Sequence, residues 1–373
     1  MMSIQLYATT EENLDKQTET KAIVTKVGEV KEVETGSIKD TVQEVTIEIL
    51  DGEYEAKEFT TNYILSYDID GKILGYELEV GDKVSVQLIE DEKGEVTATV
   101  QNVIRDKYIF AMFGLFLLTI VLIGGKQGIK AIAGLLITIL AVYFILIKGI
   151  YLGHNVIGMT IATSAIIITF TFIIIGGFSK KILTAALGTL GGVVSSGIVA
   201  VIFGHLAKLS GACEDAVQLS MNMTSVQFDF RGLIFAGIVI SALGACMDVG
   251  MSIASSLDEI KNKTKDISWK ELFKSGMNIG KDVIGTMTNT LILAYVGGAL
   301  TLILLFLACN MGMTEILNKE TISEEIISAL AGSMGVVFTV PITAILYAVL
   351  NRRKTTYKME TDTKLDGQRS LKL

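Results

Sequence analysis

The sequence predicts a membrane protein: an all-α bundle of about seven transmembrane helices with a small N-terminal soluble β-barrel-like domain. Three observations predict this fold class. Half of the 373 residues are hydrophobic and only 19% are charged, which is too apolar for an ordinary soluble domain. Acidic residues concentrate in the first hundred positions. Apolar stretches long enough to cross a bilayer recur from Tyr108 onward.

Residues 22–106 are predicted to form an extracytoplasmic β-rich domain. Val45, Ile47 and Ile49 alternate with polar residues, and residues 84–88 repeat this period of two. Four glycines that favour tight turns separate the runs: Gly52, Gly71, Gly81 and Gly94. Strands with one apolar side can close a common core, so we expect a small barrel.

Charge is distributed unevenly along the chain. Residues 1–100 contain 23 Asp and Glu against 9 Lys, a net charge of −14, and the remainder carries +6. The sequence therefore predicts an acidic soluble domain followed by a mildly basic membrane domain. It contains no basic cluster suited to nucleic acid, which is not an expected partner.

The N-terminal segment, residues 1–21, precedes the first expected strand. Residues 1–10 are too short to supply a complete signal peptide. The fragment Leu6-Tyr7-Ala8 is compatible with the end of a signal that begins upstream of Met1, and an uncleaved N-terminus is the alternative. The sequence leaves both readings open.

Seven apolar stretches are long enough to cross about 30 Å of hydrocarbon. They cover residues 108–124, 129–147, 156–177, 182–206, 232–254, 284–308 and 326–350. We therefore expect a transmembrane domain at residues 107–354 and a cytoplasmic tail at residues 355–373.

The loops between these stretches predict the orientation. One alternate set is rich in Lys and Arg: Lys126, Lys130, Lys180, Lys181, the 261–281 connection and Arg352-Arg353-Lys354. The other set is poor in lysine and acidic: Glu214, Asp215, Asp229, Glu315, Glu320, Glu324 and Glu325. Because cytoplasmic loops keep the excess of Lys and Arg, the first set is expected inside and the β-rich domain outside.

The connection before the sixth stretch has an amphipathic pattern. Trp269, Leu272 and Ile279 fall near one helical face, and Lys270 and Lys274 fall on the opposite side. This pattern predicts a helix that lies in the cytoplasmic interface. An ordinary solvated connection is the alternative.

Four expected membrane helices carry small and polar residues at helical spacing, so each set shares one face. The sets are Thr184, Gly188, Gly192 and Ser195; Gly237, Ser241, Gly244, Asp248, Ser252 and Ser255; Asn278, Asp282, Gly285 and Asn289; and Ser328, Gly332, Gly335, Thr339 and Thr343. Small residues commonly line helix interfaces because they let backbones approach closely. We expect that role for Gly237, Ser241, Gly244, Ser252, Gly285, Gly332, Gly335 and Thr339.

Asp248 differs from these small residues because it lies some fifteen residues into its span. A charged carboxylate at that depth costs about 3 kcal/mol or more, so Asp248 is expected to face the protein interior, protonated or paired. We interpret it as a candidate for transport or proton coupling, with a buried carboxyl that only bonds helices together as the alternative. Asp282, nearer the cytoplasmic surface, and Asn289 are further candidates.

No catalytic, metal or cofactor site is expected. His154 and His205 lie at outer helix ends with no second ligand at suitable spacing. The three cysteines, Cys213, Cys246 and Cys309, are far apart and match neither a zinc spacing nor a disulfide framework. The sequence contains no Gly-Lys-Ser/Thr phosphate loop, Gly-x-Ser-x-Gly elbow or His-Glu-x-x-His helix, so we do not expect an enzyme.

Two segments of the sequence resemble the signature segments of the YibE/F family of bacterial membrane proteins. They are GACMDVGMSIASS at residues 244–256 and GMNIGKDVIGTMTNTLILAYVG at residues 276–297. The resemblance extends over nearly the whole chain, including the β-rich domain. It implies a multi-pass protein of the bacterial plasma membrane and implies no substrate.

A weaker similarity links the C-terminal helices to the RND permease and SecD/SecF group. In that group an apolar helix carries an Asp that takes part in proton-coupled work, and a Glu-Ile type exit follows it. Asp248 matches the Asp, and Asp258-Glu259-Ile260 matches the exit. The similarity covers about the last 150 residues, and the chain lacks the large extracytoplasmic domain of the group and has extra helices in front.

Two functional hypotheses of different classes follow. The first is a permease or export component, whose last four helices form a polar-lined bundle with Asp248 as a proton-titrating or substrate-facing carboxyl. The second is a non-transporting membrane scaffold whose β-rich domain binds an envelope partner. The lipid bilayer is the expected surrounding, and a homo-oligomer or a paired membrane subunit is the further partner considered. The residues specify no substrate, transport direction or coupling ion.

Overall fold

The computed structural model describes residues 16–35, 38–65, 76–90, 94, 96–211, 229–264 and 266–351. Most of the expected N-terminal segment, the tail at residues 355–373 and Cys213 lie outside the described residues. The chain divides into two compact units, Met1–Phe116 and Leu117–Leu373. The first contains all the described strands, and the second contains most of the helical residues.

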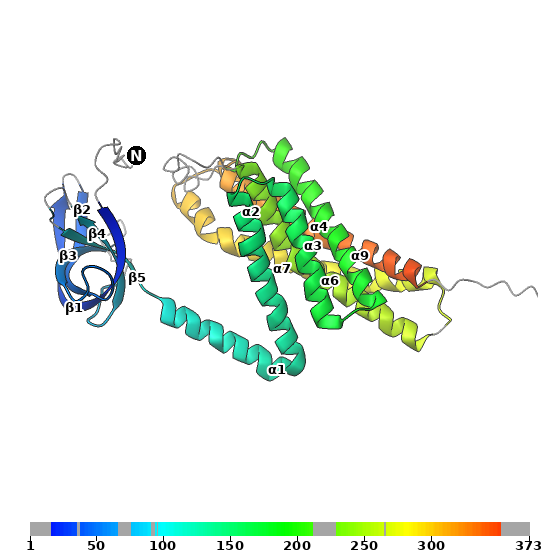
Figure 1. Cartoon of the computed structure of the whole chain (residues 1–373). Helices are drawn as coiled ribbons and strands as arrows, with labels where there is room; N and C mark the ends of the chain where they lie inside the picture. The colour runs from blue at the N-terminus through cyan, green and yellow to red at the C-terminus, as the bar shows by residue number, and fades with distance from the viewer. Residues whose placement is uncertain are drawn as a thin grey trace, which may run out of the picture. The chain divides into compact units, whose positions relative to one another are not determined.

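The first unit is a five-stranded antiparallel sheet that curls into a nearly closed barrel (Figure 1). Its strands are β1 (Lys16–Thr35), β2 (Ile38–Ile49), β3 (Glu58–Leu65), β4 (Lys83–Glu90) and β5 (Val96–Val103), in the order β3-β2-β1-β4-β5. The long strand β1 pairs with both β2 and β4, and two register shifts against β2 allow it to bend. The edge strands β3 and β5 contact each other. The predicted β-barrel-like domain is confirmed, although β1 begins at Lys16, before the expected start.

The alternating apolar residues form the barrel core, as the period of two predicted. Val45, Ile47 and Ile49 are at most 1% exposed, and their cross-sheet neighbours Val84 and Val86 are fully buried. The turns fall at the predicted glycines that the structure describes: Gly52, Gly81 and Gly94 have φ angles of 92°, 99° and 78°. Residues with a Cβ rarely adopt such positive φ angles, so glycine is favoured there. Gly71 lies outside the described residues.

One buried amide attaches the segment before β4 to the sheet. Gln43 of β2 is 3% exposed, and its Nε2 donates to the carbonyl of Leu78 at 3.0 Å. The N–H of Leu78 donates back to Gln43 Oε1 at 2.8 Å. Both backbone groups of a buried coil residue are therefore satisfied by one side chain, as buried polar groups require.

Six helices in the described part of the chain are long and apolar enough to cross a membrane. The first candidate span runs from Asp106 to Tyr151 and consists of α1 (Asp106–Ala141), a short π-helical segment (Val142–Ile147) and α2 (Lys148–Tyr151). α1 is broken at Gly125, whose φ and ψ are 53° and −131°, and Figure 1 shows the chain reversing its course there. This break lies between the predicted stretches 108–124 and 129–147. The predicted bundle of about seven transmembrane segments is therefore confirmed.

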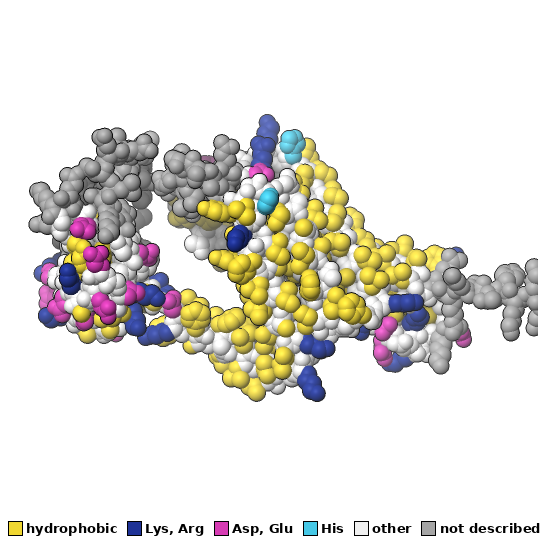
Figure 2. Space-filling model, viewed as in Figure 1, with side chains coloured by type: hydrophobic (Ala, Val, Ile, Leu, Met, Phe, Trp, Pro, Cys, Tyr) yellow, Lys and Arg dark blue, Asp and Glu magenta, His cyan; other side chains and the backbone are white. Residues whose placement is uncertain are grey.

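The other candidate spans are α3 (Val156–Gly176), α4 (Lys180–Leu206), α6 (Phe230–Lys263), α7 (Trp269–Ala308) and α9 (Glu320–Leu350), with a short α8 (Met313–Leu317) before the last. α9 packs against α4, α6 and α7 and is the central helix of the bundle. Hydrophobic side chains cover most of the helical face seen in Figure 2, as expected for a surface in contact with lipid.

The 261–281 connection does not form a separate interfacial helix. α7 begins at Trp269, capped by Ser268 and Glu271, and continues as one helix to Ala308. Its first turns pack inside the bundle, because Gly276 approaches Leu257 and Ala344 and Gly280 approaches Val340. Glycines at these two contacts allow the helix to close on its neighbours, which the amphipathic pattern did not reveal.

Hydrogen bonds between helix ends show which connections lie together at each end of the bundle. At one end Lys130 Nζ donates to the carbonyl of Ile175 at 3.2 Å, and Lys261 Nζ donates to Asn351 Oδ1 at 2.7 Å. At the opposite end Glu320 accepts hydrogen bonds from Ser210 and from the N–H of Gly211. The first end therefore collects the lysine-rich connections, and the second collects the acidic start of α9.

Candidate functional site

The polar stripe of α6 lies on the outer face of the single chain. Gly237, Ser241, Gly244, Asp248 and Ser252 are all exposed. A Cβ built on Gly237 or Gly244 would meet nothing within 4 Å. Asp248 was expected to face a protein interior, but the described helices of its own chain do not bury it. Ser255, at the end of the stripe nearest the lysine-rich connections, is half-buried.

α6 turns a different face toward the bundle. Ala242, Cys246 and Gly250 follow one another at a spacing of four residues and face α9 and α4: Ala242 lies beside Gly332, Cys246 beside Gly335, and Gly250 beside Thr189. This face is about 180° from Asp248, since each residue advances about 100° around a helix. Packing of the small-residue face Ala242-Cys246-Gly250 is the physical reason that Asp248 points outward.

The polar stripe of α7 is also exposed. Asn278, Asp282, Gly285 and Asn289 lie on the open side of the helix, and a Cβ on Gly285 would meet nothing within 4 Å. The open faces of α6 and α7 are joined at one point, where Ser241 Oγ and Tyr295 Oη lie 2.5 Å apart. Tyr295 was not singled out from the sequence, although a hydroxyl within the apolar run 291–308 was the available signal.

The Ser241–Tyr295 contact and the contact of Gly276 with Leu257 fix α6 and α7 as antiparallel neighbours. Asp248 is seven residues beyond Ser241, and Asn289 is six residues before Tyr295. The two side chains therefore lie at about the same depth along the bundle. Asp282 is seven residues further along α7, so it lies about 10 Å nearer the lysine-rich end. The structure thus brings Asp248 and Asn289 to one level and leaves Asp282 apart.

The small residues of α4 and α9 are buried, in contrast to those of α6 and α7. Gly332, Gly335 and Thr339 lie between α9 and its neighbours α4 and α6. Gly192 of α4 lies directly against Thr339, and Gly335 lies against Ser196. Within the described residues, then, the candidate interface residues Gly332, Gly335 and Thr339 pack inside the chain, whereas Gly237, Ser241, Gly244, Ser252 and Gly285 do not.

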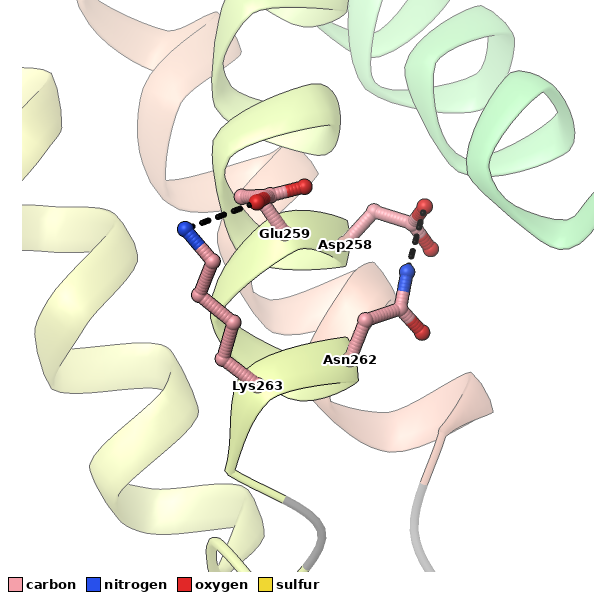
Figure 3. A network of polar contacts seen from close by, with 4 residues as sticks. All are labelled: Asp258, Glu259, Asn262 and Lys263. Atoms are coloured by element: carbon pink, nitrogen blue, oxygen red, sulfur yellow. Dashed lines mark hydrogen bonds and ion pairs between the residues drawn. The ribbon is translucent and has the colours of Figure 1, made fainter.

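A polar network holds the lysine-rich end of α6 (Figure 3). Asp258 accepts a hydrogen bond from Tyr347 Oη at 2.7 Å and lies 3.4 Å from Asn262 Nδ2. Glu259 forms an ion pair with Lys263 at 2.9 Å. Because Tyr347 is buried in α9, its bond to Asp258 ties α6 to the central helix. These acids therefore have structural partners, unlike Asp248, for which no side-chain partner is present in the described part of the chain.

No group of three His, Cys, Asp or Glu side chains that could hold a metal ion occurs among the described residues. His154 and His205 are both exposed near helix ends. Cys246 is buried against α9, and Cys309 is exposed. The chemistry that the candidate site offers is therefore that of a carboxyl, an amide and hydroxyls along an open polar face.

A family model of the YibE/F-like proteins matches residues 112–353. The chain belongs to the YibE/F-like family. The matched region includes α3 to α9 and thus Asp248, Asp282 and Asn289. It does not include the five strands, so the family match is narrower than the expected resemblance, which extended over the β-rich domain. No curated protein and no solved structure matches this YibE/F-like chain.

Proposed function

We propose that this YibE/F-like protein is a permease or export component of the bacterial plasma membrane, with a polar path along the open face of α6 and α7. Asp248 serves as the proton-titrating or substrate-facing carboxyl, Asn289 lines the path at the same level, and Asp282 lies toward its inner end. The observation that carries the proposal is the exposure of Asp248 on a face that the helices of its own chain leave uncovered.

The energetic argument concerns the surroundings of that carboxyl. A charged side chain in the middle of a bilayer costs at least about 3 kcal/mol when it faces hydrocarbon. The stripe on both sides of Asp248 consists of Gly and Ser rather than of large apolar residues, so it does not offer a surface suited to lipid. A water-containing path between this face and a second copy of the chain, or a paired membrane subunit, removes the cost. Protein partners therefore form part of the proposal.

The orientation is proposed from the loop charges and the helix ends. The lysine-rich end, which carries Lys126, Lys130, Lys180 and Lys181, is cytoplasmic, and the β-rich domain is extracytoplasmic. Reporter fusions after residue 105 and at the C-terminus test this proposal: we expect the two reporters on opposite sides of the membrane. Both reporters on one side would contradict the topology.

Cysteine accessibility tests the polar path. In a chain whose Cys213, Cys246 and Cys309 are replaced by serine or alanine, Ser252→Cys and Gly244→Cys should react with a membrane-impermeant thiol reagent. Ile198→Cys on α4 is the matched control, because Ile198 is 56% exposed on an apolar helix face and should contact lipid. If the thiol reagent labels neither Ser252→Cys nor Gly244→Cys more than the Ile198→Cys control, a water-containing path is refuted.

Asp248→Asn separates the permease from the scaffold. The amide keeps the shape of the side chain and most of its hydrogen bonding but cannot titrate, so a proton-coupled permease should lose activity without loss of protein. The readout is complementation of a deletion strain at matched membrane abundance, with Asn278→Asp as a control for charge on the same open side. Full complementation by Asp248→Asn would favour the scaffold hypothesis, in which the β-rich domain binds an envelope partner.

A further inference from the structure

An apolar groove of about 540 Å³ runs between α3 and α4 at the end where the two helices are joined. Ile168, Phe172 and Ile182 form its floor and are at most 4% exposed, whereas Leu183 and Leu187 on its rim are 52% and 41% exposed. On α4 the groove extends from Lys180 to Leu190, about 15 Å along the helix axis. That length is about half of the hydrocarbon thickness, so the groove lies within one leaflet.

The closed end of this groove carries positive charge. Lys180 lines the groove, and Lys181 follows it in the first turn of α4. Ser179 caps α4 by accepting from the N–H of Ile182 at 3.2 Å, and the first N–H groups of a helix add partial positive charge. Phe178, in the turn beside the lysines, is 90% exposed, which suits an aromatic ring at the membrane–water boundary.

Within the part of the chain that the structure describes, no acidic side chain neutralises these two lysines. The sequence contains no Asp or Glu between Asp106 and Glu214. Asp258 and Glu259 of α6 lie toward the same end of the bundle, but they are engaged by Tyr347 and Lys263. Among the described residues, neither Lys180 nor Lys181 forms an ion pair.

We propose that the α3–α4 groove binds one anionic glycerophospholipid. An acyl chain lies along the floor over Phe172 and Ile182, and the phosphate meets Lys180, Lys181 and the start of α4. The apolar groove accommodates the acyl chain of the lipid, and the unpaired lysines favour an anionic headgroup. Basic pockets between transmembrane helices favour such lipids. This site is separate from the open face of α6 and α7, so it stands whether or not the protein is a permease.

Native mass spectrometry of the detergent-purified full chain tests the proposal, with phosphatidylglycerol and phosphatidylcholine of identical acyl chains as probes. The wild type should retain one phosphatidylglycerol in preference to phosphatidylcholine. Each lysine near the membrane surface raises the affinity for an anionic lipid about 5-fold. The double variant Lys180→Gln with Lys181→Gln should therefore bind phosphatidylglycerol about 30-fold more weakly. Lys148→Gln, an exposed lysine on another helix, is the matched control and should retain the lipid.

The groove itself is tested by filling it and by fluorescence. Ala186→Phe and Ala165→Phe place a ring in the groove and should abolish retention of both lipids in protein that elutes as a single species. Independently, Phe178→Trp in a Trp269→Phe background introduces one tryptophan at the lysine end of the groove, and chain-brominated phosphatidylglycerol should quench it more than brominated phosphatidylcholine does. Equal quenching by the two lipids, or equal retention in the lysine variant and the Lys148→Gln control, would overturn the proposal.

Discussion

Glycine-to-alanine substitutions on the packed face of α4 and the open face of α6 should differ in their effect on stability. A Cβ at Gly192 would overlap Thr339 Oγ1 and would lie 2.7 Å from the carbonyl oxygen of Gly335. Thr339 cannot simply rotate away without giving up its bond to Gly335, where its Oγ1 donates at 2.8 Å. Overpacking of this kind costs about 1–3 kcal/mol, whereas alanine gains about 1 kcal/mol in helix propensity over glycine. Gly192→Ala should therefore be neutral to about 2 kcal/mol less stable than the wild type.

Gly244→Ala is the matched control on the open face. A Cβ at Gly244 meets nothing within 4 Å, so only the propensity gain of about 0.5–1 kcal/mol remains. The two variants should differ by about 1–3 kcal/mol, and at roughly 2–4 °C per kcal/mol their unfolding midpoints should differ by several degrees. Heating in detergent at a fixed rate, followed by size-exclusion chromatography, measures the midpoints. If the unfolding midpoint of Gly192→Ala equals or exceeds that of Gly244→Ala, the assignment of the packed and open faces is refuted.

Two further predictions concern the β-rich domain, measured in a fragment of residues 16–105, which we expect to fold alone because its core is complete. Gln43→Leu should destabilise it by about 2–3 kcal/mol, because both backbone groups of the buried Leu78 lose their partner; a loss below about 0.5 kcal/mol in urea denaturation would contradict this. Hydrogen bonds from the Thr20 hydroxyl and the Lys21 N–H hold the pKa of Asp51 below its ordinary value of 3.8. The stabilisation by Asp51 is therefore present above that value and is lost as the pH falls through the lowered pKa. Below about pH 4 the melting temperature of the wild type should fall more steeply than that of Asp51→Asn, and parallel pH profiles would argue against the prediction.

The elements that the sequence predicted correctly are those with a local signal. The barrel strands follow from alternation, because residues such as Ile47 and Val86 must occupy one side of a strand to be buried. The membrane segments follow from length and apolarity, and the break at Gly125 falls in the short gap between two predicted stretches. The start of α7 has a local signature, the capping box of Ser268 and Glu271. The packing of its first turns inside the bundle was missed because it depends on contacts of Gly276 and Gly280 with other helices, which have no local signature.

The buried face of α6 could not be predicted from the helix wheel alone. The wheel finds two faces of small residues at nearly the same spacing, one through Ser241 and Asp248 and one through Ala242, Cys246 and Gly250. In lipid no hydrophobic force drives one of them inward, so close packing decides. A Cβ on Gly250 would overlap Thr189 Oγ1, and a Cβ on Gly335 would lie 3.4 Å from Cys246 Sγ, so α6 approaches α4 and α9 closely at these glycines. The choice therefore depends on complementary small residues in α4 and α9, which are far away in the sequence.

This arrangement has a consequence for how the YibE/F-like chain is assembled. α6 packs against the bundle through one small-residue face. Substitutions on its polar face, which carries Asp248, should therefore leave the bundle stable. The polar face is available for another role. The second half of α7 is also largely open: Leu293, Leu300 and Leu304 are more than 50% exposed, and most of the buried residues of the helix lie in its first turns. Exposed leucines are suited to contact with lipid, whereas a charged Asp248 in contact with lipid is costly. Under the proposed function, a second subunit that covers the polar stripe of α6 would bury Asp248. The residues that hold the chain together are therefore distinct from those that the proposed function assigns to a partner interface.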